Sequence, residues 1–156
     1  NYDKHLTTEL LLDYNLWLQD GGRVTAEQFS KLSYSEKMDM LDYIAGASLY
    51  EVIKNSGKEY RLVHAGLSNF TPDKAIDEYD LYDFLEERTD YTKRYYPEEN
   101  IFLVTGHTPT VHIKDWGKTK VYMKNGHIAL DCACVAGGKL AAFCIETEEI
   151  VYVDGL

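Results

Sequence analysis

Residues 60–67 have the sequence Tyr-Arg-Leu-Val-His-Ala-Gly-Leu, an apolar run that ends in a histidine two positions before a glycine. A short apolar run that follows turn-forming residues, here 55–58, is typical of a buried β-strand. His64 would then lie at the carboxyl end of the strand, where open α/β sheets place their ligand sites. Gly66 allows the backbone to turn sharply beside the imidazole. The stretch therefore predicts a strand that carries a histidine to the edge of a sheet.

A second stretch repeats this pattern. Residues 101–105 are Ile-Phe-Leu-Val-Thr, and Gly106 and His107 follow them directly. We therefore predict that His64 and His107 lie close together in space. Each histidine taken alone is better explained as a hydrogen-bonded core residue, but their parallel placement favours a site, because imidazoles at strand ends beside glycines are a common way to hold a divalent metal. Two histidines do not complete a metal site, so further ligands, such as carboxylates, would have to come from elsewhere.

The composition limits the class of protein. The chain has 156 residues, 45% of them hydrophobic, which predicts a single unit over 1–156 with a substantial core. A formal net charge of −10 argues against binding to nucleic acid or to anionic lipid. No apolar run approaches the roughly 20 residues of a membrane span. Three cysteines form no disulfide framework, which favours a reducing, cytoplasmic setting.

Helix signals dominate the first third of the chain. Thr7 or Thr8 is a candidate N-cap for a helix that is expected to stop at Gly21-Gly22. Two capping boxes, each a hydroxyl residue followed three positions later by Gln or Glu, predict further helix starts. They are Thr25 with Gln28 and Ser33 with Glu36.

Strand signals dominate the remainder, apart from one short helix over about 81–88 on an acidic, solvated stretch. We predict a hairpin over 48–65, the strand at 101–104 and a hairpin around the turn dipeptide Asn125-Gly126. A last hairpin is expected from 140–145 and 150–153, and the apolar residues of 101–104 and 140–145 predict strands that are buried on both faces. The fold class is therefore α/β, with helices first and mostly antiparallel strands last.

Other groups with chemical potential have simpler explanations. Asp131 follows a strand and could assist a metal site, although an ordinary turn role is the better interpretation. Cys132, Cys134 and Cys144 could supply thiolates, but their spacing differs from that of structural zinc sites, and we expect small buried hydrophobes. No Gly-x-Ser-x-Gly motif and no phosphate-cradling glycine-rich loop is present.

Taken together, these residues resemble the calcineurin-like metallophosphoesterases, specifically the bacterial Ser/Thr phosphoprotein phosphatase branch. The sequence Leu-Val-His-Ala-Gly-Leu at 62–67 and Thr-Gly-His-Thr-Pro-Thr at 105–110 are similar to the last two metal-ligand motifs of that family. Residues 131–140 are similar to its closing Asp-x-Gly…Gly-Gly-x-Leu stretch, with Ala133 in place of the usual glycine. Pro109 stands where other metallophosphoesterases have a second histidine, which favours the phosphoprotein phosphatases and their bis(nucleosyl)-tetraphosphatase relatives.

The resemblance implies an incomplete domain. The family's Asp-x-His, Gly-Asp-x-x-Asp-Arg-Gly and Gly-Asn-His-Asp/Glu motifs do not occur in the sequence. The chain is therefore expected to be the C-terminal half of a four-layer α/β/β/α sandwich. In the intact family member His64 and His107 would bind the second of two divalent metals, Mn²⁺ in the first instance and Fe or Zn otherwise. Arg88 matches the arginine that grips substrate phosphate, although it could simply complement a helix C-terminus.

The implied function is metal-dependent hydrolysis of a phosphomonoester, with a phosphorylated protein or a small phosphoester as substrate. The isolated chain is expected to be inactive, because it lacks the other ligands and the acid histidine. It is also expected to associate with itself or with the missing half. Two alternatives stay open: a bis(nucleosyl)-tetraphosphatase-like hydrolase, and a non-catalytic binding or assembly domain.

Overall fold

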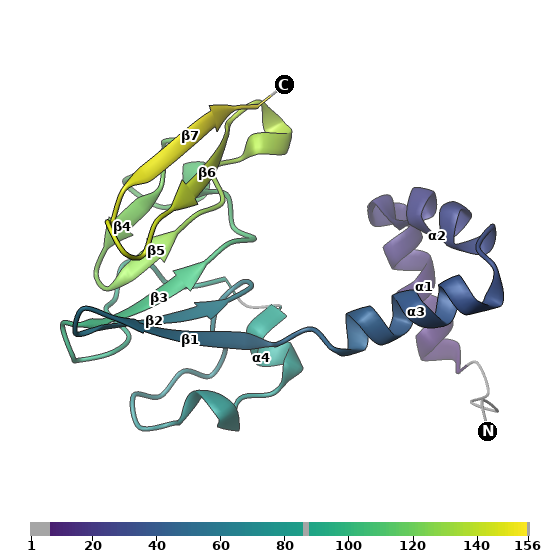
Figure 1. The fold of residues 1–156 in the computed structure, drawn as a ribbon, viewed down its shortest axis with the longest axis horizontal. Coiled ribbons are helices and arrows are strands. Elements are labelled where there is room, and N and C mark those ends of the chain that lie inside the picture. The colour runs from purple at the N-terminus through teal and green to yellow at the C-terminus, as the bar shows by residue number, and fades with distance from the viewer. Residues whose placement is uncertain (1–6, 86–87, 156) are drawn as a thin grey trace. The chain divides into compact units, whose positions relative to one another are not determined.

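The computed structural model of the chain describes residues 7–85 and 88–155 (Figure 1). Their contacts divide the chain into two compact units: a helical unit up to Ala47 and a strand-rich unit from Ser48 onward. The sequence predicted one unit, so this division differs from the expectation. The order of the elements, helices first and strands afterwards, agrees with it.

The helical unit begins with α1 (Thr8–Trp17), which is capped by Thr7 as predicted, because its side chain accepts a hydrogen bond from Leu10 N at 3.2 Å. The turn η1 (Leu18–Gly22) then redirects the chain at Gly21, where φ is +94°. The indole of Trp17 lies directly against Gly22, and a Cβ added there would be 2.3 Å from the ring. Helix α2 (Arg23–Ser30) starts two residues before Thr25. The predicted helix start at the Thr25–Gln28 box is therefore wrong.

Helix α3 (Tyr34–Ala45) confirms the second capping box. Ser33 Oγ accepts from Glu36 N at 3.4 Å, and the Glu36 carboxylate accepts from Ser33 N at 2.8 Å. The Ser33 hydroxyl also donates to the Glu36 carboxylate at 2.7 Å, and this bond together with that from Ser33 N lowers the pKa of Glu36 below its ordinary value. Within the described part of α1, α2 and α3 no side chain is buried. None of the helices in the described ranges has both the length and the hydropathy needed to cross a bilayer.

The strand-rich unit holds seven strands and one α-helix in its described part. The first hairpin and the following helix are β1 (Tyr50–Asn55), β2 (Lys58–Val63) and α4 (Leu81–Leu85). The remaining strands are β3 (Ile101–Thr105), β4 (Tyr122–Lys124), β5 (His127–Ala129), β6 (Lys139–Phe143) and β7 (Ile150–Asp154). Short helical turns are η2 (Ile76–Glu78), η3 (Thr110–His112) and η4 (Cys134–Ala136). The predicted strands and hairpins are confirmed.

Five strands form one mixed sheet in the order β1-β2-β3-β5-β4. Both hairpins in it are antiparallel, whereas β3 pairs in parallel with β2 on one side and with β5 on the other. In the second hairpin Asn125 and Gly126 have φ values of +53° and +73°, the left-handed values that a type I′ turn requires. The three parallel strands β2, β3 and β5 therefore end at the same edge of the sheet.

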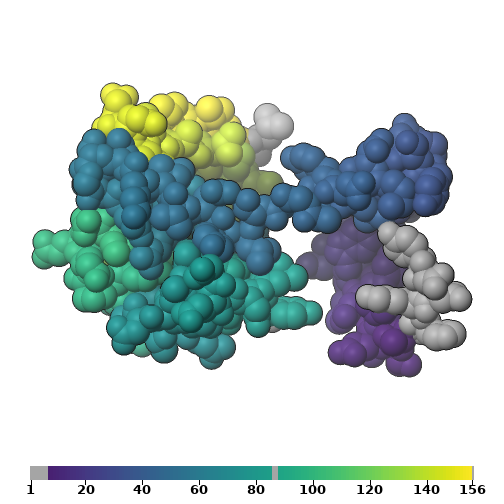
Figure 2. All heavy atoms as spheres, turned by 60° about the horizontal axis from the view of Figure 1, so that its bottom comes forward, coloured from purple at the N-terminus to yellow at the C-terminus, as the bar shows by residue number. Residues whose placement is uncertain are grey.

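Strand β3 is buried on both faces, as its apolar sequence predicts. Successive side chains alternate between two clusters: Leu103 packs with Phe84 and Val63, while Val104 packs with Tyr60 and Ile128. The first cluster is covered by α4 and the connection between β2 and β3, which Figure 2 shows in teal at the front of the unit. The second is covered by the separate hairpin β6–β7. The sheet is therefore an inner layer.

Hairpin β6–β7 packs on one face only, where its residues are half-buried, and the prediction that residues 140–145 are buried on both faces is wrong. Its inner residues, such as Phe143 and Tyr152, pack on the sheet. On its outer face Leu140, Val151 and Val153 are each more than 60% exposed, and Leu140 is paired directly with Val153. The described structure thus leaves a row of aliphatic side chains in contact with solvent.

Candidate metal and phosphate site

The candidate site lies at the edge where the parallel strands end. His64 directly follows β2, and Gly106 and His107 directly follow β3. The two strand ends are tied together because Gly106 N donates to the carbonyl oxygen of His64 at 2.9 Å. Strand β5 ends beside them, since Leu130 N donates to the carbonyl oxygen of Thr105 at 2.8 Å. Main-chain hydrogen bonds thus hold all three strand ends in register.

His64 and His107 are in contact, which confirms the prediction that they lie close together. Nε2 of His64 and Nδ1 of His107 are 3.2 Å apart, and the ring centroids are 4.9 Å apart. Both residues are exposed. His107 also has a φ of +60°, in the left-handed region that non-glycine residues rarely occupy and that is concentrated at functional positions. Both side chains are therefore accessible, and the left-handed backbone of His107 has a conformational free-energy cost.

The spacing of the two nitrogens suits a shared metal. Two nitrogens bound to one ion at about 2.1 Å are about 3.0–3.4 Å apart for bond angles between 90° and tetrahedral. The observed 3.2 Å falls within this interval, and it also suits an N–H···N hydrogen bond between the rings. Neutral imidazole nitrogen is a ligand that Mn, Fe and Zn all accept. The pair thus fits the role of two ligands of a divalent ion.

The described residues supply no complete metal site. Across residues 7–85 and 88–155, no cluster of three or more His, Cys, Asp or Glu side chains is placed to hold an ion. The carboxylate of Asp131 is used locally, because its Oδ1 accepts from Ala133 N at 3.0 Å. This agrees with the turn role that the sequence favoured. Among the described residues, the histidine pair therefore has no His, Cys, Asp or Glu beside it that would complete such a group.

The cysteines do not form a thiolate site. Cys132 is buried, as expected, and burial raises the pKa of its thiol. Cys134 is half-buried and Cys144 is exposed, so the expectation of small buried hydrophobes is wrong for Cys144. The thiol of Cys144 donates to the carboxylate of Glu146 at 3.3 Å. Of the remaining histidines, for which the sequence indicates no partners, His5 lies outside the described residues.

Arg88 is exposed and lies close to the strand that carries His64. Its neighbour Thr89 donates from Oγ1 to the carbonyl oxygen of Ala65 at 3.2 Å, and that bond is buried. Helix α4 holds the same residue from the other side, since Ala65 N donates to the carbonyl oxygen of Phe84 at 3.0 Å. The predicted helix end near Arg88 falls on residues 86–87, which lie outside the described residues. Arg88 therefore directly precedes Thr89, whose side chain is hydrogen-bonded to the chain just after His64.

A pocket of about 190 Å³ opens beside Arg88. Residues 88–92 form one wall, residues 112–114 form the other, and Thr108 lines it next to His107 in the chain. Tyr91 also lines the pocket, and its hydroxyl is held by a contact of 2.8 Å with Thr105 Oγ1. Burial raises the pKa of Tyr91. Neither histidine of the pair lines this pocket. The histidine pair and the pocket are adjacent but separate features of the same sheet edge.

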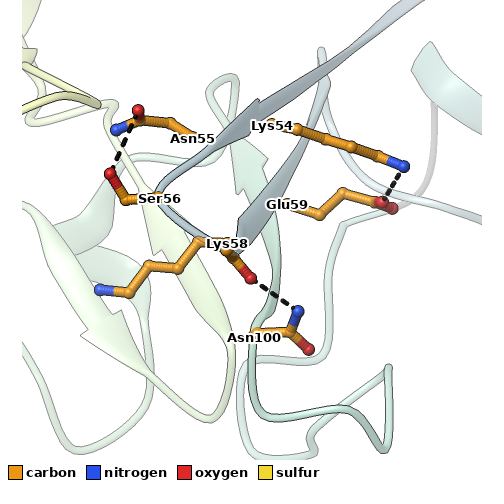
Figure 3. Close-up of a pocket in the computed structure, with 7 residues that line it drawn as sticks. Lys54, Asn55, Ser56, Lys58, Glu59 and Asn100 are labelled. Carbon is orange, nitrogen blue, oxygen red and sulfur yellow. Dashed lines mark hydrogen bonds and ion pairs between the residues drawn. The ribbon is translucent and has the colours of Figure 1, made fainter.

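A second hollow, of about 400 Å³, lies at the opposite end of β2, around the turn between β1 and β2 (Figure 3). Its polar groups are already paired: Lys54 with Glu59 at 3.2 Å, and Asn100 Nδ2 with the carbonyl oxygen of Gly57 at 2.8 Å. The Lys58 ammonium pairs with Glu148 across the unit. A hollow whose charges are satisfied internally has little to offer a charged ligand, so we place the site at the other end of the strands.

Sequence reasoning missed three residues of the pocket: Thr108, His112 and Lys114. The loop that follows β3 brings them together, and loops carry no hydrophobic period that would place them. A charge signal was present, however. Residues 110–124 contain four lysines and one acidic residue, whereas the chain as a whole has a net charge of −10.

No family model matches the chain, and no curated protein matches it in sequence.

Proposed function

We propose that this chain is part of a metal-dependent phosphoester hydrolase, of the Ser/Thr protein phosphatase kind that its motifs resemble. The observation that carries the proposal is the 3.2 Å separation of two accessible imidazole nitrogens at the ends of two parallel strands. An inner sheet with a β-layer on one face and α4 on the other is what the C-terminal part of an α/β/β/α sandwich would contain. The proposed substrate is a phosphorylated protein or a small phosphoester.

The residues have distinct roles in this proposal. His64 and His107 each offer one ring nitrogen to the same divalent ion, and the Gly106–His64 backbone hydrogen bond fixes the distance between them. When bound, divalent ions polarise a phosphoryl oxygen and activate a water molecule for attack. Arg88 orients the substrate phosphate, since a planar guanidinium can donate two parallel hydrogen bonds to phosphate oxygens. The remaining ligands and the general acid belong to the segment whose motifs the chain lacks.

Metal binding tests the proposal directly on the 156-residue chain. We expect added Mn²⁺ to broaden the NMR signals of the His64 and His107 rings first, at concentrations that leave the ring signals of His112 sharp. His64→Ala should weaken the effect at His107, because a two-nitrogen chelate becomes a single ligand. His112→Ala, which removes an exposed histidine outside the pair, is the matched control. Equal broadening of every exposed histidine, unchanged by His64→Ala, would show that the pair is only a hydrogen bond.

Activity provides a second test. The chain alone should hydrolyse phosphomonoesters negligibly even with added Mn²⁺, because it lacks further ligands and an acid for the leaving group. A turnover of about 1 s⁻¹, the lower range of ordinary enzymes, that His64→Ala abolishes would contradict the incomplete-domain proposal. In a protein that also carries the missing motifs, Arg88→Ala should reduce phosphate hydrolysis and leave the metal content unchanged.

A further inference from the structure

The pocket beside Arg88 contains a polar group that nothing satisfies. Thr108 is only 5% exposed, and its Oγ1 has no hydrogen-bond partner among the described residues. A buried hydroxyl without a partner is unfavourable, and a hydrogen bond to a bound water molecule or ligand would remove that cost. The other buried hydroxyls of the pocket are occupied: Thr89 bonds to Ala65 and Tyr91 to Thr105. Among the described hydroxyls that line the pocket, Thr108 Oγ1 is therefore a buried one that has no partner.

The charges around the pocket favour an anion. Arg88 and Lys114 line it, and neither takes part in an ion pair between described residues. The one carboxylate in the lining, Asp90, is already occupied by Thr92 and Lys93. Its hydrogen bonds to Thr92 and Lys93 lower its pKa to about 2, so it stays ionised and paired. Two cations that have no ion-pair partner among the described residues therefore face one carboxylate that has its own partners, which favours an anion in the pocket.

The geometry points to a second oxyanion site: we infer that Thr108 and Lys114 bind a tetrahedral oxyanion of the substrate next to the phosphate that Arg88 orients at the histidine pair. This inference rests on the proposed function, because it places the second anion on the same substrate. Neither His64 nor His107 lines the pocket, so an anion held there is not the one at the pair. A volume of about 190 Å³ has room for one phosphate group with water. The preferred substrate would thus be a phosphoester with a second phosphate group close by.

Titration of the full chain with inorganic phosphate, followed by amide NMR shifts with metal removed by EDTA, tests the pocket. We expect saturable shifts at Thr108, at Lys114 and along 88–92. Lys114→Gln and Thr108→Val should each weaken phosphate binding about five- to tenfold, the worth of one charge-assisted or buried hydrogen bond. Lys120→Gln, which removes an exposed lysine outside the lining, is the control and should change binding by less than about twofold.

Two further arms separate the outcomes. His64→Ala should leave phosphate binding in the pocket intact, so a failure of metal binding at the pair would not remove it. Acetate, a carboxylate probe, should bind more weakly than phosphate. The inference is overturned if phosphate causes no saturable shift, if Lys120→Gln weakens binding as much as Lys114→Gln, if His64→Ala abolishes binding, or if acetate binds more tightly.

Discussion

Gly138 is the position where one added methyl group should damage the strand-rich unit most. A Cβ at Gly138 would lie 2.1 Å from the carbonyl oxygen of Cys132 and 2.8 Å from that of Ala133. Both contacts are with backbone atoms, so no flexible side chain can move to make room. The neighbouring Gly137 is a natural comparison, because it has a φ of +78° but open space around its Cα.

The expected cost follows from the hydrogen bonds that hold the turn. Gly138 N donates to Ala133, Lys139 N donates to Cys132, and Gly155 N donates to the carbonyl oxygen of Gly138, at 2.8–2.9 Å. Losing these bonds at about 1 kcal/mol each makes Gly138→Ala destabilising by about 3 kcal/mol. Gly137→Ala retains them and has only the left-handed backbone penalty, about 1 kcal/mol.

Urea unfolding measures both variants. The chain has two tryptophans, so a Trp17→Phe background leaves Trp116 as the fluorescence reporter of the strand-rich unit. We expect Gly138→Ala to lower the urea midpoint by roughly 1–3 M, given slopes of about 1–3 kcal/mol per M. Gly137→Asn, which tolerates a positive φ, should recover most of the smaller loss in Gly137→Ala. The reasoning is refuted if Gly137→Ala is the more damaging substitution, or if both variants unfold like the parent.

Three further outcomes follow from the structure. Burial lowers the pKa of His127, whose Nε2 lies 2.7 Å from the Lys93 carbonyl oxygen. As the pH falls, the unfolded chain therefore protonates at His127 before the folded chain does. The contribution of His127 to the free energy of unfolding should be constant above a pH of about 6.5 and should fall below it, by at most about 1.4 kcal/mol per pH unit. Calorimetry of His127→Gln should show a shallower fall. Ser33→Ala should destabilise α3 by about 1 kcal/mol and speed amide exchange in its first turns about fivefold, with no change in the strands. The row of exposed aliphatic side chains on β6–β7 should bind a second copy of the chain, so light scattering should show a dimer. The double variant Leu140→Asp/Val151→Asp should be a monomer, and a monomeric parent would contradict this prediction.

Local signals in the sequence predicted local structure well. Ser33 and Glu36 satisfy each other within one turn of helix, so their capping box needs no distant partner. The Thr25 box failed because the chain reaches α2 directly from η1, with Gly22 held beneath Trp17, and no free helix N-terminus is left at Thr25.

The histidine pair was also predictable, since two apolar strands that end in histidines place them by strand geometry alone. The pocket beside Arg88 was not, because Thr108 and Lys114 reach it through the loop that follows β3. The division near Ala47 was missed for a related reason. Apolar residues in the first third indicate helix faces, but they do not show that these faces stay exposed within the helical unit.

The parallel pairing that joins His64 to His107 also sets when the site can form during folding. The three hairpins β1–β2, β4–β5 and β6–β7 close short turns, which takes about 1–10 μs in isolated hairpins. The two histidines are 43 residues apart, and only the non-local β2–β3 pairing brings them together. Closing that longer loop costs more entropy before any contact offsets it. The imidazole contact should therefore appear late, which makes it a direct reporter of the last step of sheet assembly.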